Sequence, residues 1–169
     1  EDLPASKMLA FYSERFTTTE VNYTFRRIPS PKTIQNWWAG TPERFKFSLK
    51  APQKMTHFAK LKNCGDTMRY FCQVITDLEG KLGPVLFQLP PNFKKDTAVL
   101  ADFLQDVPAG LRAAFEFRHP SWFDEEVFAL LNGKNIALCI AESADLSAPV
   151  VATAYYCPAS QSDVSVYKN

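Results

Sequence analysis

The stretch FEFRHPSW, residues 115–122, places ionisable side chains at the end of an alternating apolar pattern. Successive side chains of a strand point to opposite faces, so the two phenylalanines share one face and the acid and the arginine share the other. A proline then ends the strand pattern. The residues concerned are Phe115, Glu116, Phe117, Arg118, His119 and Pro120. Two interpretations are open: a strand end that binds a ligand or takes part in catalysis, and an ion pair with a structural role.

Outward from this stretch, helix-like and strand-like segments alternate along the chain. Helical spacing of apolar residues marks residues 4–16, 30–41, 66–83, 96–107 and 123–134, with N-cap candidates at Ser30, Asp96 and Asp124. Strand patterns mark residues 17–25, 44–51, 84–91, 111–119 and 135–143. Single strands separated by helices predict an α/β fold built from parallel βαβ units. An open doubly wound sheet and a closed (β/α)8 barrel both fit, and length alone favours the open sheet because barrels usually contain about 250 residues.

The composition is globular, and we expect residues 1–169 to form a single domain. The 19 basic and 18 acidic residues leave a net charge of +1, which gives no electrostatic indication of nucleic-acid or membrane binding, although a local patch could still bind nucleic acid. No apolar run approaches the roughly 18 residues that span a bilayer. The N-terminus lacks the basic start and apolar core of a signal peptide, so we expect a cytoplasmic protein.

The cysteines give no indication of a metal site. The four of them, Cys64, Cys72, Cys139 and Cys157, form no CxxC pair and have no histidine at metal-ligand spacing. We therefore expect reduced thiols and no bound metal. The nucleotide-binding patterns GxxxxGKS/T and GxGxxG and the hydrolase patterns GxSxG and HExxH are also absent from the sequence, and no cofactor is expected.

Polar side chains gather at the carboxyl ends of the expected strands, where parallel α/β folds bind their ligands. Acids and histidines suit proton transfer, and the candidate catalytic residues are Glu20, Glu116, His57 and His119. Cations and amides suit an anionic ligand, and the candidate substrate-binding residues are Asn22, Lys50, Gln88, Arg118 and Trp122. Structural alternatives stand beside these roles: a core position for Trp122, a loop position bonded to backbone for His119, and a solvated surface for the basic loop at residues 46–62.

Three longer motifs resemble those of the domain-of-unknown-function 72 family, also called the YecE-like proteins. They are EVNYTFRRIPSPKTIQNWWAGTPERFKFSLKAPQKMTH (residues 20–57), KLGPVLFQLPPNF (residues 81–93) and AFEFRHPSW (residues 114–122). The similarity runs from about Leu3 to about Ala154, in the family's order and spacing. It implies a TIM-type (β/α)8 barrel, which takes precedence over the open sheet that length favours.

The resemblance also implies which parts of the barrel the chain contains. The strand patterns correspond to the second to sixth strands of the barrel, and residues 163–169 resemble the eighth. The first strand and much of the seventh repeat are therefore expected to be missing. The family's polar positions fall on Glu20, Asn22, Thr24, Lys50, His57, Gln88, Glu116, Arg118, His119, Ser121 and Trp122.

The residues and the resemblance together predict an enzyme that acts on a small anionic or phosphate-bearing substrate. Glu116 or Glu20 is the expected acid or base, His57 or His119 would transfer protons, and the lysine and arginine of the strand ends would neutralise the anion. The family's activity is not established, and a likeness of the barrel to phosphodiester-cleaving and sugar-isomerising barrels is fold analogy alone.

Two alternatives accompany this prediction. One is a non-catalytic module that binds nucleic acid or another anion through the basic loop at residues 46–62 and Trp122. The other is a purely structural role for the charged pairs at the strand ends.

Overall fold

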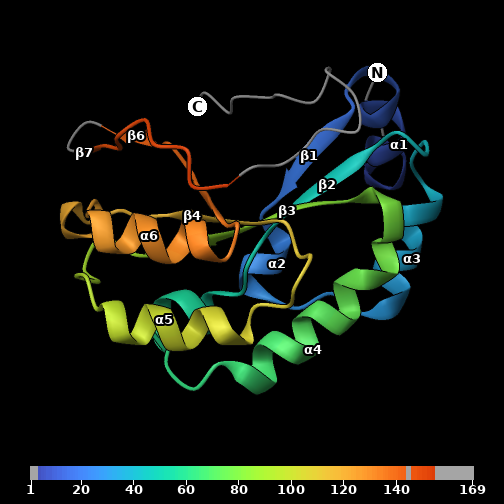
Figure 1. Cartoon of the computed structure of the whole chain (residues 1–169). Helices are drawn as coiled ribbons and strands as arrows, with labels where there is room; N and C mark the ends of the chain where they lie inside the picture. Colours follow the sequence, from blue (N-terminus) through green and yellow to red (C-terminus); the bar gives the residue numbers. More distant parts are fainter. Residues whose placement is uncertain (1–3, 144–145, 155–169) are drawn as a thin grey trace.

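The computed structural model describes residues 4–143 and 146–154, and its central feature is a five-stranded parallel sheet (Figure 1). The strands lie in the sheet in the order in which they occur in the sequence. They are β1 (Thr18–Val21), β2 (Lys46–Lys50), β3 (Leu82–Gln88), β4 (Ala113–Glu116) and β5 (Ala137–Leu138). The prediction of an α/β fold with a parallel sheet is confirmed.

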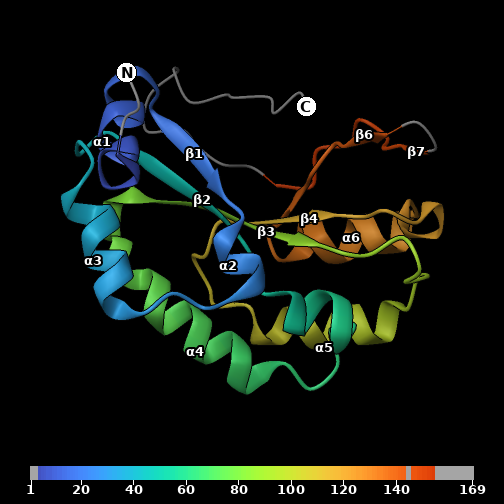
Figure 2. The same cartoon turned by 180° about the vertical axis from the view of Figure 1, so that it is seen from behind.

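Four of the helices cover one face of this sheet. The helical elements are α1 (Ala5–Arg15), α2 (Tyr23–Arg26), α3 (Pro31–Ala39), α4 (Gly65–Ile75), α5 (Thr97–Asp106) and α6 (Glu125–Gly133), with shorter π- or 3-10-helical segments η1 (Lys54–Phe58), η2 (Thr76–Lys81) and η3 (Pro120–Trp122). From α3 to α6 each helix packs on the next, and all four lie on the same side of the strands in both views (Figures 1 and 2). A doubly wound sheet needs helices on both faces and a reversal of strand order, and neither is found among the described residues.

The five described strands form an open sheet. The first and last of them, β1 and β5, each pair with one neighbour, so these strands do not close into the eight-stranded barrel that the resemblance implies.

Side-chain caps begin three of the helices at the residues that the sequence indicates. Ser30 Oγ accepts a hydrogen bond from the amide of Thr33 at 3.2 Å at the start of α3. The carboxylates of Asp96 and Asp124 accept from backbone amides at the starts of α5 and α6, at 3.1 and 3.0 Å. Each cap satisfies an amide that the helix itself leaves unpaired.

The hydrophobic core lies between the sheet and these helices. Phe47, Phe87 and Phe115, from three neighbouring strands, are each at most 1% exposed. The rings of Phe87 and Phe115 stack with centroids 5.1 Å apart, and Phe103 of α5 meets both of them edge-on. Because every second residue of these strands is buried in this core, the residues between them face the opposite side of the sheet.

The first strand is shorter than the predicted segment 17–25, and the prediction beyond Val21 is wrong. The fully buried hydroxyl of Thr24 lies 2.9 Å from the carbonyl oxygen of Val21 and 2.6 Å from that of Lys50. These side-chain contacts with the backbone accompany the turn of the chain into α2, so the strand ends before Asn22.

The last strand is also shorter than predicted. The hydroxyl of Thr153 accepts a hydrogen bond from the amide of Leu138 and donates one to the carbonyl of Ile136, both at 2.7 Å. After β5 the chain leaves the sheet and forms a hairpin of β6 (Glu142–Ser143) and β7 (Leu146–Ser147) on the side away from α4 and α5 (Figure 1). Residues 163–169, which resemble the eighth strand of the barrel, lie outside the described residues.

Candidate functional site

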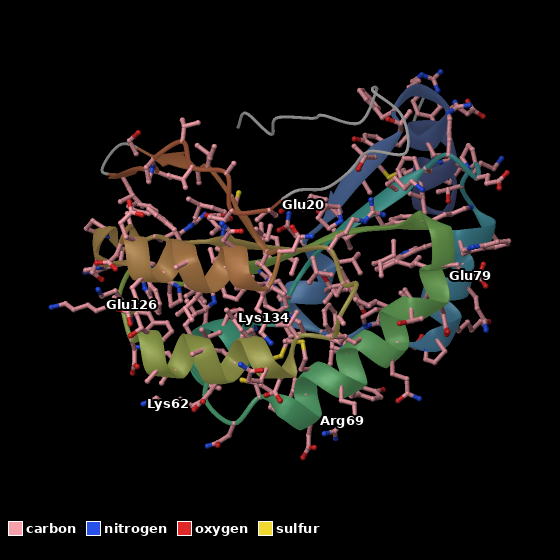
Figure 3. All side chains as sticks on the ribbon, viewed as in Figure 1. Glu20, Lys62, Arg69, Glu79, Glu126 and Lys134 are labelled. Carbon is pink, nitrogen blue, oxygen red and sulfur yellow. The ribbon has the colours of Figure 1, made fainter. Side chains whose placement is uncertain are left out.

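Polar side chains gather on the face of the sheet opposite the core, at the carboxyl ends of the strands. Glu20 lies opposite Ser48 in the β1–β2 register, and Gln88 lies opposite Glu116 in the β3–β4 register. Figure 3 shows Glu20 on the side of the sheet away from α4 and α5. We call this group the strand-end site, and its members are Glu20, Lys50, His57, Gln88, Glu116, Arg118 and Cys139.

Glu116 connects β3 to the arginine that follows β4. Its side chain is 8% exposed, and its Oε1 accepts hydrogen bonds from Gln88 Nε2 at 2.9 Å and from Arg118 Nε at 2.7 Å. Oε2 has no hydrogen-bond partner among the described residues. Every fully buried side-chain oxygen or nitrogen of those residues does have a partner, so Oε2 is not fully buried and keeps some exposed surface.

Lys50 is a largely buried cation with few contacts. Its side chain is 14% exposed, and its Nζ lies 3.6 Å from Glu20 Oε1, which is beyond ordinary hydrogen-bond distance. The same Nζ lies 5.7 Å from the centre of the Phe25 ring, within the range of a cation–π interaction. Within the described ranges, no hydrogen-bond acceptor for this ammonium group is found.

His57 extends the strand-end site into η1, the π-helical segment that follows β2. Its Nδ1 lies 2.9 Å from the hydroxyl of Thr56, and its ring meets Phe25 edge-on with centroids 4.9 Å apart. Burial lowers the pKa of His57 below its ordinary value, and the positive charges of Arg118 and Lys50 lower it further. The imidazole is therefore mostly neutral at pH 7, and it lies within electrostatic range of the two cations of the site.

Cys139 is a member of the site that sequence reasoning missed. Its amide donates to the carbonyl of Phe115 at 2.8 Å, which continues the β4–β5 register and sets Cys139 beside Glu116. Burial raises the pKa of the Cys139 thiol to about 11, and the negative charges of Glu116 and Glu20 raise it as well, against the opposing effects of Arg118 and Lys50. The thiol thus lies within electrostatic reach of all four charges of the site.

The signal for Cys139 was present but weak. Ile136 and Leu138 are buried in the core, so the alternation of a strand puts Cys139 on the opposite face. The predicted strand extends to residue 143, whereas β5 ends at Leu138. The polar residues expected at the end of this strand therefore lie beyond Cys139.

Three predicted site residues make no described contact with this group. Asn22 is exposed at the start of α2 and makes no capping hydrogen bond. His119 caps η3, where its Nδ1 contacts the hydroxyl of Ser121 at 2.8 Å and accepts from the amide of Ser121 at 3.2 Å. Trp122 is fully buried, and its indole N–H donates to the carbonyl of Phe93 at 2.6 Å.

The position of Trp122 corrects its predicted role in ligand binding. A side chain with no exposed surface and an occupied N–H cannot stack on a base or contact a substrate. Trp122 therefore cannot be the stacking side chain of the alternative nucleic-acid-binding module.

No group of three or more histidine, cysteine, aspartate or glutamate side chains that could hold a metal ion is found in the part of the chain that the structure describes. None of the helices described here combines the length and apolarity needed to cross a membrane.

The raised thiol pKa values predict slow alkylation of the folded protein. Burial raises the pKa of Cys64 and Cys72 to about 11, as it does for Cys139. Since the thiolate is the reactive form, we expect iodoacetamide at pH 8 to modify Cys139 about 100-fold more slowly in the folded protein than in the urea-unfolded chain. Peptide mass spectrometry over time measures both rates, and the folded-state rate should rise steeply up to pH 11. Equal rates in the two states would contradict this assignment.

A parallel sheet with sequential strands, helices on one face and a polar group at the strand ends defines the class of protein: an α/β protein, a class in which ligand sites commonly lie at the strand ends. The family model described as Protein of unknown function DUF72 matches residues 1–164, and the chain belongs to this family. The resemblance to the YecE-like proteins is thereby confirmed.

The sequence is similar to bacterial proteins of the same family. It is 30% identical over 113 residues to UPF0759 protein YecE of Escherichia coli (strain K12), which covers 66% of this chain and 42% of that protein. It is 32% identical over 127 residues to UPF0759 protein YunF of Bacillus subtilis (strain 168), which covers 70% and 45% of the two chains. The matched region is thus less than half the length of these relatives.

Solved structures of the family share the fold. A DUF72 family protein from Thermotoga maritima MSB8 matches with a TM-score of 0.78 and 28% identity, covering 90% of this chain and 63% of that one. A DUF72 family protein from Enterococcus faecalis V583 matches with a TM-score of 0.73 and 19% identity, covering 88% and 66% of the two chains.

Proposed function

We propose that the strand-end site binds a small anionic substrate, such as a phosphate-bearing molecule, and transfers a proton to or from it. The observation that carries this proposal is the ammonium group of Lys50. The Lys50 side chain is only 14% exposed, and among the described residues its Nζ has a carboxylate at 3.6 Å and no hydrogen-bond acceptor. No buried side-chain nitrogen of the described residues lacks a hydrogen-bond partner, so Nζ keeps some exposed surface, and the oxygens of an anion can supply the acceptors that its three donors lack within the described protein.

Arg118 supplies a second set of donors. It uses Nε to bind Glu116, its side chain is 51% exposed, and no partner of its two terminal nitrogens is found among the described residues. A guanidinium group offers such nitrogens in a planar fork that matches the oxygens of a carboxylate or phosphate. The pair with Glu116 fixes the direction of this fork.

Glu116 is the proposed acid or base. Its Oε1 is held by two donors, while its Oε2 keeps some exposed surface and carries no hydrogen bond from a described residue. A carboxylate held in this way can accept or donate a proton at Oε2 without moving. Glu20, paired with Lys50, and the neutral imidazole of His57 are the other groups of the site that can exchange protons.

A non-catalytic anion-binding module is the alternative within the same geometry. It needs Lys50 and Arg118 but gives no role to Oε2 of Glu116. Substitution Glu116→Gln would leave such a module's binding nearly unchanged, whereas an enzyme would lose turnover of its substrate.

We also propose that β1 to β5 are five neighbouring strands of a single (β/α)8 barrel domain. Support comes from the sequential strand order and from the four helices on one face, because a barrel is wound in one direction and carries its helices outside. The strand-end site would then lie at the mouth of the barrel. In this arrangement the described strands are the second to sixth, as the resemblance implies.

Removal of either cation should weaken anion binding. We expect Lys50→Met and Arg118→Gln each to reduce the affinity for inorganic phosphate by about 10-fold or more, because each loses charge-assisted hydrogen bonds of about 1.5–3 kcal/mol. Isothermal titration calorimetry measures the change directly.

Matched controls lie on the helical side of the molecule. Lys62 and Arg69 are exposed cations that point outward from the helical side (Figure 3), so Lys62→Met and Arg69→Gln remove the same charges far from the strand ends. Both should leave phosphate affinity within roughly 2-fold of the unsubstituted chain. Equal losses in all four variants would indicate a nonspecific charge effect and would refute the site.

A further inference from the structure

We propose that the strand-end site binds its ligand as a dianion and that His57 takes up a proton when this happens. The inference rests on the function proposed above and specifies its substrate class: a molecule with a doubly charged head group, of which a phosphomonoester is the common biological example.

The geometry places His57 beside the anion-binding cation of β2. The ring of Phe25, from α2, contacts the imidazole edge-on at 4.9 Å between centroids, and the ammonium of Lys50 lies 5.7 Å from the centre of the same ring. The imidazole and the ammonium are thus arranged around one aromatic side chain. Lys50 also acts electrostatically on the imidazole, so the charge of a ligand bound at Lys50 lies within range of His57.

The hydrogen bond of His57 suits both of its charge states. Thr56 is fully buried, and its hydroxyl lies 2.9 Å from Nδ1 of His57. A hydroxyl group can donate to a neutral ring nitrogen and can accept from a protonated one, so this contact survives protonation. Nε2 has no described partner and is the nitrogen left to face a ligand.

The charges around His57 make its protonation depend on a ligand. Lys50 of β2 and Arg118 after β4 are the cations that face it, and Glu20 and Glu116 are their paired carboxylates. Burial and the two cations keep the imidazole mostly neutral near pH 7. Each negative charge that a ligand adds near Lys50 and Arg118 favours the imidazolium form of His57, so a dianion promotes its protonation more than a monoanion does. The ligand's oxygens can also accept a hydrogen bond from the imidazolium.

The proton balance of this step is simple. The proton comes from water or buffer and binds to a ring nitrogen of His57, and no bond of the ligand is made or broken. With this proton bound, the imidazolium of His57 is a third positively charged hydrogen-bond donor to the head group of the ligand, in addition to Lys50 and Arg118.

The chain contains two histidines, His57 and His119, so imidazole NMR signals can be followed and assigned with His57→Gln. The experiment titrates the full chain with pH in the presence of sulfate, methanesulfonate or sodium chloride at equal ionic strength. Sulfate is a dianion and methanesulfonate a monoanion at every pH used, so neither probe adds a titration of its own.

We expect sulfate to raise the pKa of His57 by about one unit or more relative to chloride, and methanesulfonate to raise it by less than about half of that shift. His119, at the cap of η3, is the internal control, and its imidazole signals should be the same in all three salts. In the Lys50→Met variant the sulfate effect on His57 should be lost.

The outcomes separate this inference from the function on which it rests. If calorimetry detects sulfate binding that Lys50→Met weakens, but the pKa of His57 does not move, proton uptake at His57 is refuted and the anion site stands. Equal shifts with the two probes would refute the preference for a dianion. If sulfate neither binds nor shifts any signal, the anion site fails, and the inference fails with it.

Discussion

Trp122→Ala is expected to lower the free energy of unfolding by about 3–5 kcal/mol, the cost of removing a large aromatic side chain from a packed core. The Trp122 ring is fully buried and stacks on Phe117 with centroids 5.0 Å apart, and Phe93 meets it edge-on at 5.2 Å. The substitution leaves a cavity and removes the hydrogen bond to the carbonyl of Phe93. Urea unfolding followed by far-ultraviolet circular dichroism measures the loss.

Two further substitutions separate a core role from a ligand-binding role. Trp122→Phe keeps most of the apolar volume and should cost about 1–3 kcal/mol, largely through the unpaired carbonyl. It should leave phosphate affinity unchanged, because the ring does not reach the surface. Phe58 is 73% exposed, so Phe58→Ala should change stability by less than about 0.5 kcal/mol. If Trp122→Ala is as stable as the unsubstituted chain but binds phosphate more weakly, the core role is contradicted and Trp122 is a ligand contact.

Lys81→Met should also destabilise the protein strongly, by about 2–4 kcal/mol. Lys81 is only 5% exposed, and its Nζ donates to the carbonyls of Trp38 at 2.5 Å and of Thr41 at 2.6 Å. These carbonyls lie at the carboxyl end of α3, where a helix leaves acceptors unpaired and where positive charge is favourable. The ammonium also lies 4.7 Å from the centre of the Trp38 ring.

Lys46→Met is the control for this substitution. Lys46 is the first residue of β2, the strand that pairs with β3. It is half-buried and donates to a single carbonyl, that of Gly80. Its removal should cost less than about 1 kcal/mol. Lys81 lies immediately before β3, at the opposite end of that strand from Gln88, so Lys81→Met should leave phosphate affinity unchanged in protein that remains folded. Equal stability losses for the two lysines would contradict the role of Lys81 at the end of α3.

The regular parts of the fold could be predicted from the sequence because their signals are local. Alternation in residues 44–51 identified β2, and polar caps at Ser30, Asp96 and Asp124 marked the starts of helices. A cap needs only a side chain and an amide two or three residues away. Such contacts form in the same way whatever the rest of the chain does.

The ends of the outer strands could not be predicted because they depend on distant residues. Thr24 ends β1 with a contact to the backbone carbonyl of Lys50. The hydroxyl of Thr153 binds the amide of Leu138 in β5 and the carbonyl of Ile136 just before it, from fifteen or more residues away in the sequence. Thr24 also fits a strand by propensity, since threonine is β-branched. Nothing in residues 17–25 alone distinguishes a strand residue from one that turns the chain.

The candidate site was accessible to prediction where it follows a strand closely. Lys50, Gln88 and Glu116 are the last residues of β2, β3 and β4, and the predicted segments 44–51, 84–91 and 111–119 end within three residues of them. Cys139 and the hydrogen bond between Thr56 and His57 were missed, because the first depends on where β5 stops and the second on a π-helical turn within a predicted loop. For Trp122 the sequence leaves both a ligand contact and a core position open, because sequence order alone does not show which way an aromatic ring turns after a strand.

The sequential order of the strands has a consequence for how the chain acquires its structure during synthesis. Each strand from β2 to β5 pairs with the strand that precedes it, so its partner has already been made when it emerges from the ribosome. Contacts between neighbouring βα units span short stretches of sequence, which favours rapid folding. The sheet can therefore be assembled one βα unit at a time, in the direction of translation, without waiting for the end of the chain.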